Sequence, residues 1–591
     1  MFRRLAALVL PGLRRSLVPA ALLMSLGAGR AFAYPYVKPL DGAFLAPSSI
    51  APNRTIASWE TEFHDMAAVG CSLLIIQLVA WNGGALYPTA LPWLQPLGSD
   101  PLESLLTAAD RQGIRVQMGS YYSTRWNDWL ADSTYLWALA DSVNQVQQEL
   151  HERYRGHTSV TGWYFTHELP NARFQFPIRH LFAGFFGLQA DWCHRTAGQP
   201  CSIAPWFDST SANFMSPEST GLFWSDVLAR SEVDILMLQD GIGRHRFRFD
   251  TIEQRYDHVE QYFRSVGSAC AAQARPREFW ADVELFSQDR SNPALLWPGD
   301  IDTIAVQLGV AQRLTQKLIG YDFHRYMNPG ANRWPASVYW EYDALLRGWT
   351  NRALHGPYSC LRSTAPGFPD QRLLTDGIKQ DQDDALTGWN DSTPIDIEIP
   401  LPAPCSVASI KCYFRQGTDS LARLPDSVQF YSTRDDTMDY LGIARPLDGR
   451  PGLRKLLLNL HPAQVLEGTR VRVFPAGTNT VFTLLSEIEI VGKESAIGIA
   501  DPARAPQPAL RTPQLTVCSP CRDRLELRFS APAMRNTAVT VYDAAGRKAD
   551  EFRVSPGIAS ARLDISRLSA GIYFLKTNAA PGIRARFTKG M

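Results

Sequence analysis

One unit recurs along this chain from about residue 36 to 355: a short apolar strand, a loop, and then an amphipathic helix. Several of the strand segments are apolar throughout rather than alternating, which is typical of strands buried on both faces of a parallel sheet. Eight strand candidates can be counted: Leu40–Pro47, Ser72–Ala80, Arg115–Tyr122, Val160–Glu168, Cys201–Phe207, Asp234–Asp240, Phe279–Phe286 and Leu318–Met327.

The segments between these strands have helical periodicity and helical end signals. Asp100-Pro101 provides a cap followed by a proline at the first helical position, and Gly113 provides the stop. Eight strand–helix units in this span predict an α/β fold, a (β/α)8 TIM barrel over residues 36–355. The alternative is a doubly wound open sheet, which would normally carry a glycine-rich first turn that is missing here.

The 591 residues are too many for one core, and the pattern changes after the barrel. Short alternating segments over residues 360–493 predict an all-β sandwich. Its expected strands include Ile395–Ile399, Ser409–Phe414, Ser427–Ser432, Arg470–Phe474 and Ser486–Val491. Residues 494–513 are rich in Ala and Pro and predict a linker. Residues 514–591 predict a small Ig-like β-domain.

The start of the chain predicts export. Arginines are followed by a short apolar core and by Ala31-Phe32-Ala33, a small-x-small cleavage site, so residues 1–33 are expected to be a signal peptide. No stretch is long enough to predict a transmembrane segment. Lys+Arg 59 against Asp+Glu 58 leaves no net field to gather nucleic acid, so we expect no nucleic-acid partner.

Cysteines and histidines give no pattern typical of a metal or cofactor site. No His/Cys cluster has zinc spacing and no glycine-rich phosphate loop is present, so we expect neither metal nor cofactor. Nine cysteines leave at least one unpaired. Cys405 with Cys412 could close a hairpin, Cys193 and Cys201 flank a helix-to-strand turn, and Cys518-Ser-Pro-Cys521 is read as a local staple or two free thiols.

The functional residues of such a barrel lie where its strands end, because the carboxyl ends of the strands meet at one rim. Glu168 ends the fourth strand and Glu284 the seventh. One protonated carboxyl group can donate to a leaving oxygen while an ionised one attacks or stabilises an anomeric carbon, so these two are the catalytic candidates. The substrate-binding candidates at the other strand ends are Gln77, Trp81, Tyr121, Tyr122, His167, Trp206, Gln239, Asp240, Asp322 and His324.

Acidic residues at the ends of strands four and seven resemble the arrangement in clan A retaining glycoside hydrolases. Within that clan the barrel resembles an uncharacterised glycosidase-like family of exported bacterial proteins. The resemblance implies Glu168 as acid/base and Glu284 as nucleophile, about 5–5.5 Å apart if retaining and about 6.5–9.5 Å apart if inverting. Clan members usually carry Asn before the acid, and His167 stands there. The matching stretches are Leu40–Phe44, Leu73–Gln77, Gly162–Glu168, Asp234–Gly241, Trp280–Glu284 and Asp322–Met327.

The two downstream segments carry resemblances of their own. Leu374–Gly377, Gly388–Asp391 and Ser486–Ile490 resemble discoidin-type, galactose-binding-like modules, which commonly bind glycans. Val541–Arg547, Leu563–Tyr573 and the basic end Arg584–Lys589 are similar to the type A C-terminal sorting domain of type IX secretion cargo. The second resemblance implies the secretion machinery as a partner, with the protein secreted or at the cell surface. The alternative is an Ig-like accessory domain without sorting function.

Together these features predict a secreted glycoside hydrolase that acts on a poly- or oligosaccharide, with a carbohydrate-binding accessory domain and a sorting tail. The alternative is a non-catalytic glycan-binding surface protein built on a glycosidase-like barrel. A third hypothesis gives Asp240 or His324 a role in other hydrolytic chemistry such as deacetylation. For Glu168 and Glu284 themselves, the purely structural alternative is an ion pair with a nearby arginine.

Overall fold

The computed structural model of the chain describes residues 37–246, 252–289, 292–418, 421–434, 437–476 and 481–495. In the C-terminal part it describes residues 515–517, 524–529, 537–543, 547–554, 560–577 and 584–589. The predicted signal peptide, the Cys518 and Cys521 pair and most of the predicted linker lie outside the described residues.

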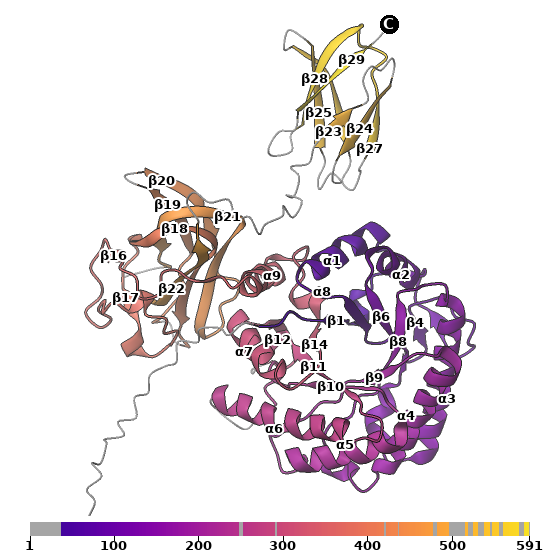
Figure 1. Cartoon of the computed structure of the whole chain (residues 1–591). Helices are drawn as coiled ribbons and strands as arrows, with labels where there is room; N and C mark the ends of the chain where they lie inside the picture. The colour runs from indigo at the N-terminus through magenta and orange to yellow at the C-terminus, as the bar shows by residue number, and fades with distance from the viewer. Residues whose placement is uncertain are drawn as a thin grey trace, which may run out of the picture.

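Eight parallel strands close into a barrel in the order β1-β14-β11-β10-β9-β8-β6-β2, so the barrel prediction is confirmed and the open sheet is excluded (Figure 1). Each predicted strand supplies one of the eight. They are β1 (Gly42–Leu45), β2 (Leu73–Ile76), β6 (Arg115–Gly119), β8 (Val160–Phe165), β9 (Cys201–Ile203), β10 (Ile235–Gln239), β11 (Glu278–Glu284) and β14 (Leu318–Tyr321).

Helices form the outer ring around these strands (Figure 1). The prediction for the helix at residue 101 is confirmed: Asp100 Oδ1 accepts the N–H of Glu103 at 3.2 Å, and Gly113 ends the helix with a left-handed φ of 70°. The helices are α1 (Ile56–Ala68), α2 (Pro101–Gln112), α3 (Ser133–Tyr154), α4 (Arg179–Trp192), α5 (Pro217–Ser231), α6 (Ile252–Ala271), α7 (Ile301–Ala311), the short α8 (Phe323–Tyr326) and α9 (Arg333–Leu346).

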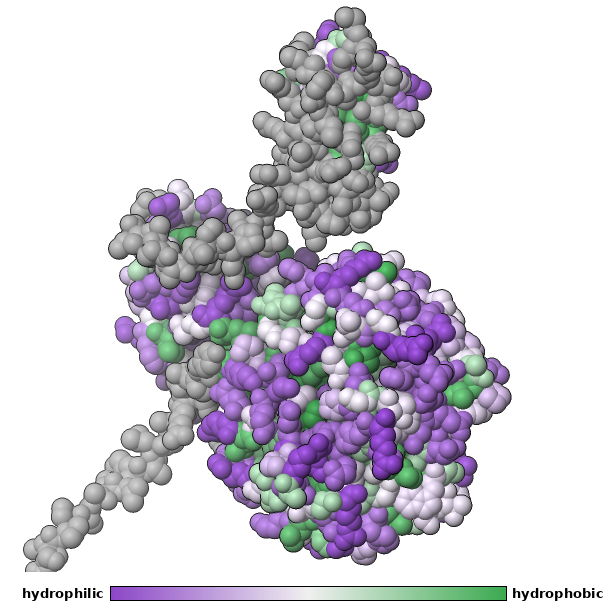
Figure 2. Space-filling view, turned by 45° about the vertical axis from the view of Figure 1, so that its right-hand side comes forward, coloured by the Kyte–Doolittle hydropathy of each residue, from purple (hydrophilic) through white to green (hydrophobic). Residues whose placement is uncertain are grey.

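The barrel has two apolar layers because successive strand residues point to opposite faces. Leu74 and Ile76 of β2 pack outward against the helices, while Leu73 and Ile75 belong to a separate core inside the barrel. The interior core is completed by Phe44, Tyr164, Ala204, Ile235, Met237, Trp280 and Ile319. This filled interior leaves the rim as the place for function. In Figure 2 the outer surface of the barrel is mainly hydrophilic, with small apolar patches.

Short strands extend the barrel at the rim where the parallel strands end. Trp81 on β3 pairs with Tyr122 on β7, and the hairpin β12–β13 follows Glu284 directly. These elements are β3 (Ala80–Trp81), β4 (Gly84–Ala85), β5 (Gln95–Pro96), β7 (Tyr121–Tyr122), β12 (Phe286–Gln288) and β13 (Leu296–Pro298).

The second domain is the predicted all-β sandwich, whose strands belong to one eight-stranded sheet folded around its own core. Its strands are β15 (Thr350–Asn351), β16 (Ser359–Cys360), β17 (Thr387–Trp389), β18 (Ile395–Gln416), β19 (Ser427–Arg434), β20 (Thr437–Ala444), β21 (Gly452–Phe474) and β22 (Thr483–Glu494). β15 pairs with β22, so the sheet begins at residue 350, upstream of the predicted start at 360.

Two details of the sandwich differ from expectation. The segments Ile395–Ile399 and Ser409–Phe414, expected to be separate strands, are parts of the single long strand β18. Its ladder with β21 is interrupted between Pro400 and Cys405, where prolines supply no N–H donor. Cys405 and Cys412 therefore lie seven positions apart on one extended strand and close no hairpin. All seven cysteines in the described part of the chain are free.

The C-terminal domain consists of two small antiparallel sheets with its own core of Leu525, Leu527, Val539, Val541 and neighbouring side chains. Its strands are β23 (Leu515–Val517), β24 (Arg524–Phe529), β25 (Thr537–Asp543), β26 (Lys548–Val554), β27 (Ser560–Asp564), β28 (Gly571–Thr577) and β29 (Arg584–Lys589). Among the helices that the structure describes, none has the length and apolarity needed to cross a membrane.

Candidate active site

Glu168 lies just beyond the end of β8 and is held by neutral hydrogen-bond donors. Its Oε1 accepts the hydroxyl of Tyr164 at 2.8 Å, and its Oε2 accepts Nε2 of Gln239 at 2.8 Å. Gln77 lies beside it and accepts the hydroxyl of Tyr321 at 3.3 Å. Burial raises the pKa of Glu168, although these hydrogen bonds and the charge of Arg246 oppose the shift. The residue remains partly exposed, so a ligand can reach it.

Glu284 ends β11 and is held by the loop that follows β10. Its Oε2 accepts the backbone N–H of Arg244 at 2.7 Å. A Cβ on Gly243 would lie 2.3 Å from the carbonyl oxygen of Phe286 and 3.1 Å from Glu284 Oε2, so only glycine allows this approach. Burial raises the pKa of Glu284, while the positive charge of Arg246 and the Arg244 N–H favour the ionised form. Glu284 is 3% exposed.

Arg246 supplies the positive charge that the two glutamates share. Its guanidinium carbon lies 3.8 Å from the centre of the Trp206 ring, and its buried Nη1 has no hydrogen-bond partner among the described residues. Its positive charge partly offsets the rise that burial causes in the pKa of Glu168 and of Glu284. Arg246 is not among the site residues predicted from the sequence, although the basic run Arg244-His245-Arg246 directly after a strand was a signal for it.

A third carboxyl group lies beside this pair. Asp282 points into the barrel two residues before Glu284, and its buried Oδ1 has no hydrogen-bond partner among the described residues. Burial, and then the charges of Glu168 and Glu284, raise its pKa well above the usual range. Because both glutamates act on Asp282, they belong to one electrostatic site. Burial and the neighbouring carboxylates therefore favour the protonated form of Asp282.

Aromatic side chains surround the rim. Trp81, Tyr121, Tyr122 and Trp206 are all partly exposed. Tyr121 packs edge-on against Trp93 with ring centres 5.1 Å apart, and Trp129 in the adjacent loop is 42% exposed. These rings offer flat apolar faces of the kind that a sugar ring can stack on.

His167 does not face this site. It is fully buried beneath Tyr122 and Trp126, with ring centres 5.3 and 4.9 Å away, and its Nε2 accepts the N–H of Ser123 at 3.2 Å. Burial lowers its pKa to about 3, so the ring is neutral. The prediction that His167 contacts substrate finds no support in this position, because neighbouring strand residues point to opposite faces and Glu168 takes the inner one.

Asp240 and Asp322 also point away from the interior. Asp240 Oδ2 accepts Nε2 of Gln307 at 2.6 Å from α7, and Gln307 also donates to the backbone oxygen of Glu284 at 3.2 Å. Asp322 is fully buried and accepts the N–H of Ala46 at 3.2 Å. Both side chains bind the protein rather than face the rim, and Asp240 supports the strand end that carries Glu284.

His324 belongs to a separate ion-pair cluster. Its Nδ1 lies 2.8 Å from Glu62 Oε2, and Glu62 also binds Arg54 at 2.5 Å and Asn328 Nδ2 at 2.7 Å. Arg54 in turn stacks on Trp59, 3.4 Å from the ring centre. His324 therefore has a satisfied structural role in this cluster.

The opposite end of the barrel holds a donor group that the sequence spacing did not reveal. His194 Nε2, Cys201 Sγ and a carboxylate oxygen of Asp234 lie within 4.8 Å of one another. Asp234 is already ion-paired with His194 at 2.8 Å and with Arg275, and it accepts the Cys201 N–H at 2.9 Å. These contacts satisfy the carboxylate within the protein, and we assign no metal to the group.

Comparison with known proteins adds family matches for two parts of the chain. Residues 40–333 match the family described as "Domain of unknown function (DUF4434)", and residues 519–585 match "Secretion system C-terminal sorting domain". No curated protein matches the chain in sequence. The sorting-domain match indicates type IX export to the cell surface or the medium.

Solved structures resemble the first two domains at low identity. A protein described as a candidate alpha-L-fucosidase from Bacteroides thetaiotaomicron aligns at 19% identity over 57% of this chain and 99% of that one, with a TM-score of 0.45. The family 32 carbohydrate-binding module of C. perfringens NanJ, solved with galactose, aligns at 13% identity over 24% of this chain and 98% of the module, with a TM-score of 0.20. A Streptococcus pneumoniae fucose-binding module aligns at 18% identity over 24% and 96%, with a TM-score of 0.20. The chain thus contains a domain matched by the DUF4434 family model, which folds as a closed (β/α)8 barrel, followed by an all-β sandwich and a type IX secretion C-terminal sorting domain.

Proposed function

We propose that this protein is an exported glycoside hydrolase that cleaves a poly- or oligosaccharide with two carboxyl groups, Glu168 as acid/base and Glu284 as nucleophile. The observation that supports the proposal most directly is the position of the two residues at nearby inner strand ends: Gln239, which donates to Glu168 at 2.8 Å, pairs in register with Asp282, two residues before Glu284. In this proposal the barrel, residues 36–355, catalyses hydrolysis, and the sandwich, residues 360–493, binds glycan. Residues 494–513 link the sandwich to the sorting domain, residues 514–591, which directs export.

The surroundings of the two carboxyl groups favour different protonation states, as acid–base chemistry requires. Several groups favour the ionised form of Glu168, and the strongest effects come from the neutral donors Tyr164 and Gln239. For Glu284, the strongest effect in favour of the ionised form comes from the cation Arg246, and the next comes from the Arg244 N–H. A cation stabilises a carboxylate more strongly than a neutral donor does, so Glu284 is the better anion and Glu168 the better acid.

Substrate contacts in this proposal come from the inner and rim positions of the barrel. Gln77 and Gln239 offer amide groups beside Glu168, while Trp81, Tyr121, Tyr122 and Trp206 offer hydroxyl groups or ring faces. His167, Asp240, Asp322 and His324 are left out of the binding set because their side chains contact other parts of the protein.

The test is hydrolysis of a polysaccharide panel, measured by release of reducing ends. We expect Glu168→Gln and Glu284→Gln each to lower turnover at least about 10²–10⁴-fold with folding intact, which is the usual contribution of a positioned acid or base. Glu278→Gln is the matched control, since it makes the same change at the exposed start of β11. Full turnover in both site variants would remove the assignment.

One observation favours a second candidate function, a non-catalytic glycan-binding protein. Glu284 is only 3% exposed, and burial raises the pKa of Glu168, Glu284 and Asp282 together, which favours protonated, non-nucleophilic carboxyl groups. Binding to a glycan array without any release of reducing ends over long incubation would support this function over hydrolysis.

A further inference from the structure

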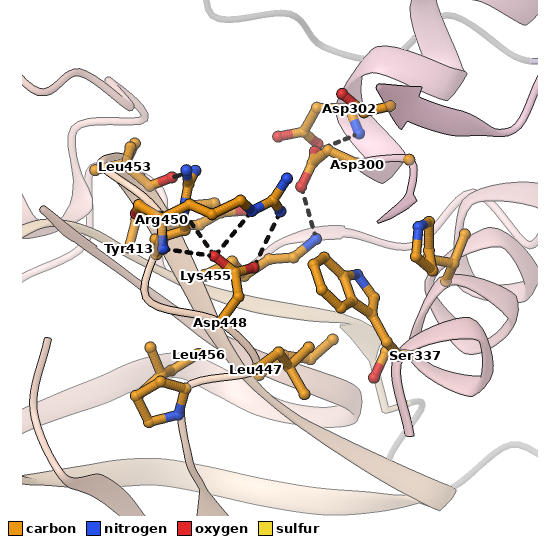
Figure 3. Close-up of a pocket in the computed structure, with 18 of the residues that line it drawn as sticks. Asp300, Asp302, Ser337, Tyr413, Leu447, Asp448, Arg450, Leu453, Lys455 and Leu456 are labelled. Atoms are coloured by element: carbon orange, nitrogen blue, oxygen red, sulfur yellow. Dashed lines mark hydrogen bonds and ion pairs between the residues drawn. The ribbon is translucent and has the colours of Figure 1, made fainter. Parts of the chain in front are cut away.

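A cavity of about 750 Å³ lies between the barrel and the sandwich (Figure 3). The barrel side is formed by the loops after β10 and β11 and by α9, and the sandwich side by the β20–β21 connection and the start of β21. Ser337 of α9 and Leu447 of the sandwich both line it. Its volume is in the range of about 300–1,000 Å³ that is typical of small-molecule sites.

The cavity and the candidate active site share a wall. Arg244 donates its N–H to Glu284, and the next residue, His245, lines the cavity. Gln288, four residues after Glu284, also lines it and binds this loop twice, through His245 Nε2 to Gln288 O at 3.1 Å and through Gln288 N to Gly243 O at 2.7 Å. One layer of backbone therefore separates the cavity from the Glu284 carboxyl group.

The charged groups of the cavity are held in pairs. Asp448 accepts two hydrogen bonds of 3.0 Å from Arg450, and its Oδ1 lies 3.3 Å from Arg454 Nε. Lys455 lies between Asp300 at 3.0 Å and Glu341 at 2.8 Å (Figure 3). Paired charges present fixed donors and acceptors with little net field, which suits hydroxyl groups better than an ion.

The lining also contains an aromatic surface. Trp334, at the start of α9, lines the cavity and stacks on Trp297 with ring centres 5.4 Å apart and planes 20° apart. The Arg450 guanidinium lies over both rings, 4.9 Å from the centre of the Trp297 ring and 5.4 Å from the centre of the Trp334 ring. A rigid aromatic group beside paired polar groups is suited to a ring that has one apolar face and a polar edge.

We propose that this cavity is a second binding site for neutral sugar units, built jointly by the barrel and the sandwich. A glycan held at the rim by the catalytic site extends over the shared wall, and a later unit of the same chain binds against Trp334 and the Asp448–Arg450 pair. This inference deepens the proposed function and rests on it for the first contact of the glycan with the rim.

The test uses the full chain carrying Glu168→Gln, so that binding is measured without turnover. Neutral cello-, galacto- and fucosyl-oligosaccharides of two to six units are titrated calorimetrically, beside oligogalacturonides of the same lengths. We expect Trp334→Ala to weaken binding of the longer neutral ligands about 10-fold or more, and to leave the shortest ligands unchanged. Trp334→Phe should restore most of the affinity.

Two further variants separate this effect from damage to the fold. Leu447→Trp adds bulk from the sandwich side at a position that is 40% exposed, and should also weaken only the longer ligands. Trp137→Ala removes a 40% exposed tryptophan of α3 outside the cavity, and should change nothing.

The outcomes are distinguishable from those of the hydrolase test. The cavity site would be overturned if the Glu168→Gln chain bound oligosaccharides of every length equally well with and without Trp334→Ala or Leu447→Trp. This holds even if the wild type cleaves glycans. Tighter binding of oligogalacturonides than of neutral ligands would overturn the neutral class. Length-dependent binding lost in Trp334→Ala, in a wild type that releases no sugar, would support the cavity site and remove hydrolysis.

Discussion

The rim of the barrel and the contact between the barrel and the sandwich both bury carboxyl groups, and they treat the charge in opposite ways. At the rim, Asp282 lies among other carboxyl groups and Glu284 shares Arg246 with Glu168, and burial raises the pKa of both Asp282 and Glu284. At the domain contact, Asp302 and Glu489 are surrounded by lysines, and the lysine charges outweigh burial and lower the pKa of each.

The domain contact is a network of ion pairs. Lys411 of β18 lies 3.0 Å from Glu341 of α9 and 3.4 Å from Glu489 of β22, while Lys379 lies 3.0 Å from Glu489 and also pairs with Asp302. Paired buried charges therefore join the two domains, whereas incompletely compensated charges lie at the site where chemistry is proposed.

We expect the greatest loss of stability when a lysine is removed from the buried ion pairs at the domain contact. Lys411→Met leaves Glu341 and Glu489 with fewer cations in a buried place, and we expect it to lower the free energy of unfolding by about 3–5 kcal/mol. Chemical denaturation measures this. Arg347→Met, which breaks the exposed pair with Asp343, is the control and should cost less than about 1 kcal/mol. Equal losses in the two variants would contradict the distinction.

The next effect concerns the cation that the two glutamates share. Arg246→Gln removes the charge that favours ionised Glu284 and Glu168, so both pKa values should rise. We expect the pH–rate profile to move to higher pH by about one unit and kcat/KM to fall about 10–100-fold. Arg246→Lys keeps the charge and should keep the profile near its original position. A lowered rate with an unmoved profile would indicate a purely steric role.

A smaller effect compares the two regions through the pH dependence of stability. A raised folded-state pKa makes an ionised Glu284 destabilising above its unfolded pKa of about 4.3, so Glu284→Gln should stabilise the protein on the order of 1 kcal/mol at pH 8 and much less near pH 4. Asp302 has a lowered pKa, so its ionised form contributes to the free energy of unfolding above about pH 4, and this contribution is lost as the pH falls. Asp302→Asn should therefore destabilise at neutral pH. Changes of the same sign would refute the contrast.

The smallest effect lies at the far end of the barrel. The hydrogen bonds of His194 with Cys201 and with Asp234 raise its pKa to about 9. The stabilisation is complete below the unfolded pKa of about 6.5 and is lost as the pH rises through 9. Because the side chain is 32% exposed, we expect only about 1 kcal/mol. Thermal unfolding should show wild type losing more stability than His194→Asn between pH 6.5 and 9.

Strand parity explains which predicted site residues the structure brings together. Glu168 lies just beyond β8, four positions after Tyr164, and accepts the Tyr164 hydroxyl, while Asp282 and Glu284 lie two apart on β11, so each pair shares the inner face. His167 is one position out of step and faces the helices. Position at a strand end was therefore too coarse a criterion, and the alternation of side chains, already present in the sequence, would have separated inner from outer residues.

The order of elements, the closed barrel and the two β-domains could be predicted from residue patterns alone, because hydrophobic periodicity and helix-end signals act over a few residues. The surroundings of each buried charge, in contrast, depend on contacts that form only in the folded molecule. The partner of Glu284 comes from the loop after β10, and Glu341 pairs with Lys455 of β21, 114 positions away, so no local pattern records these contacts. The same reason hid the cavity between the domains, whose walls meet only when both domains have folded and docked.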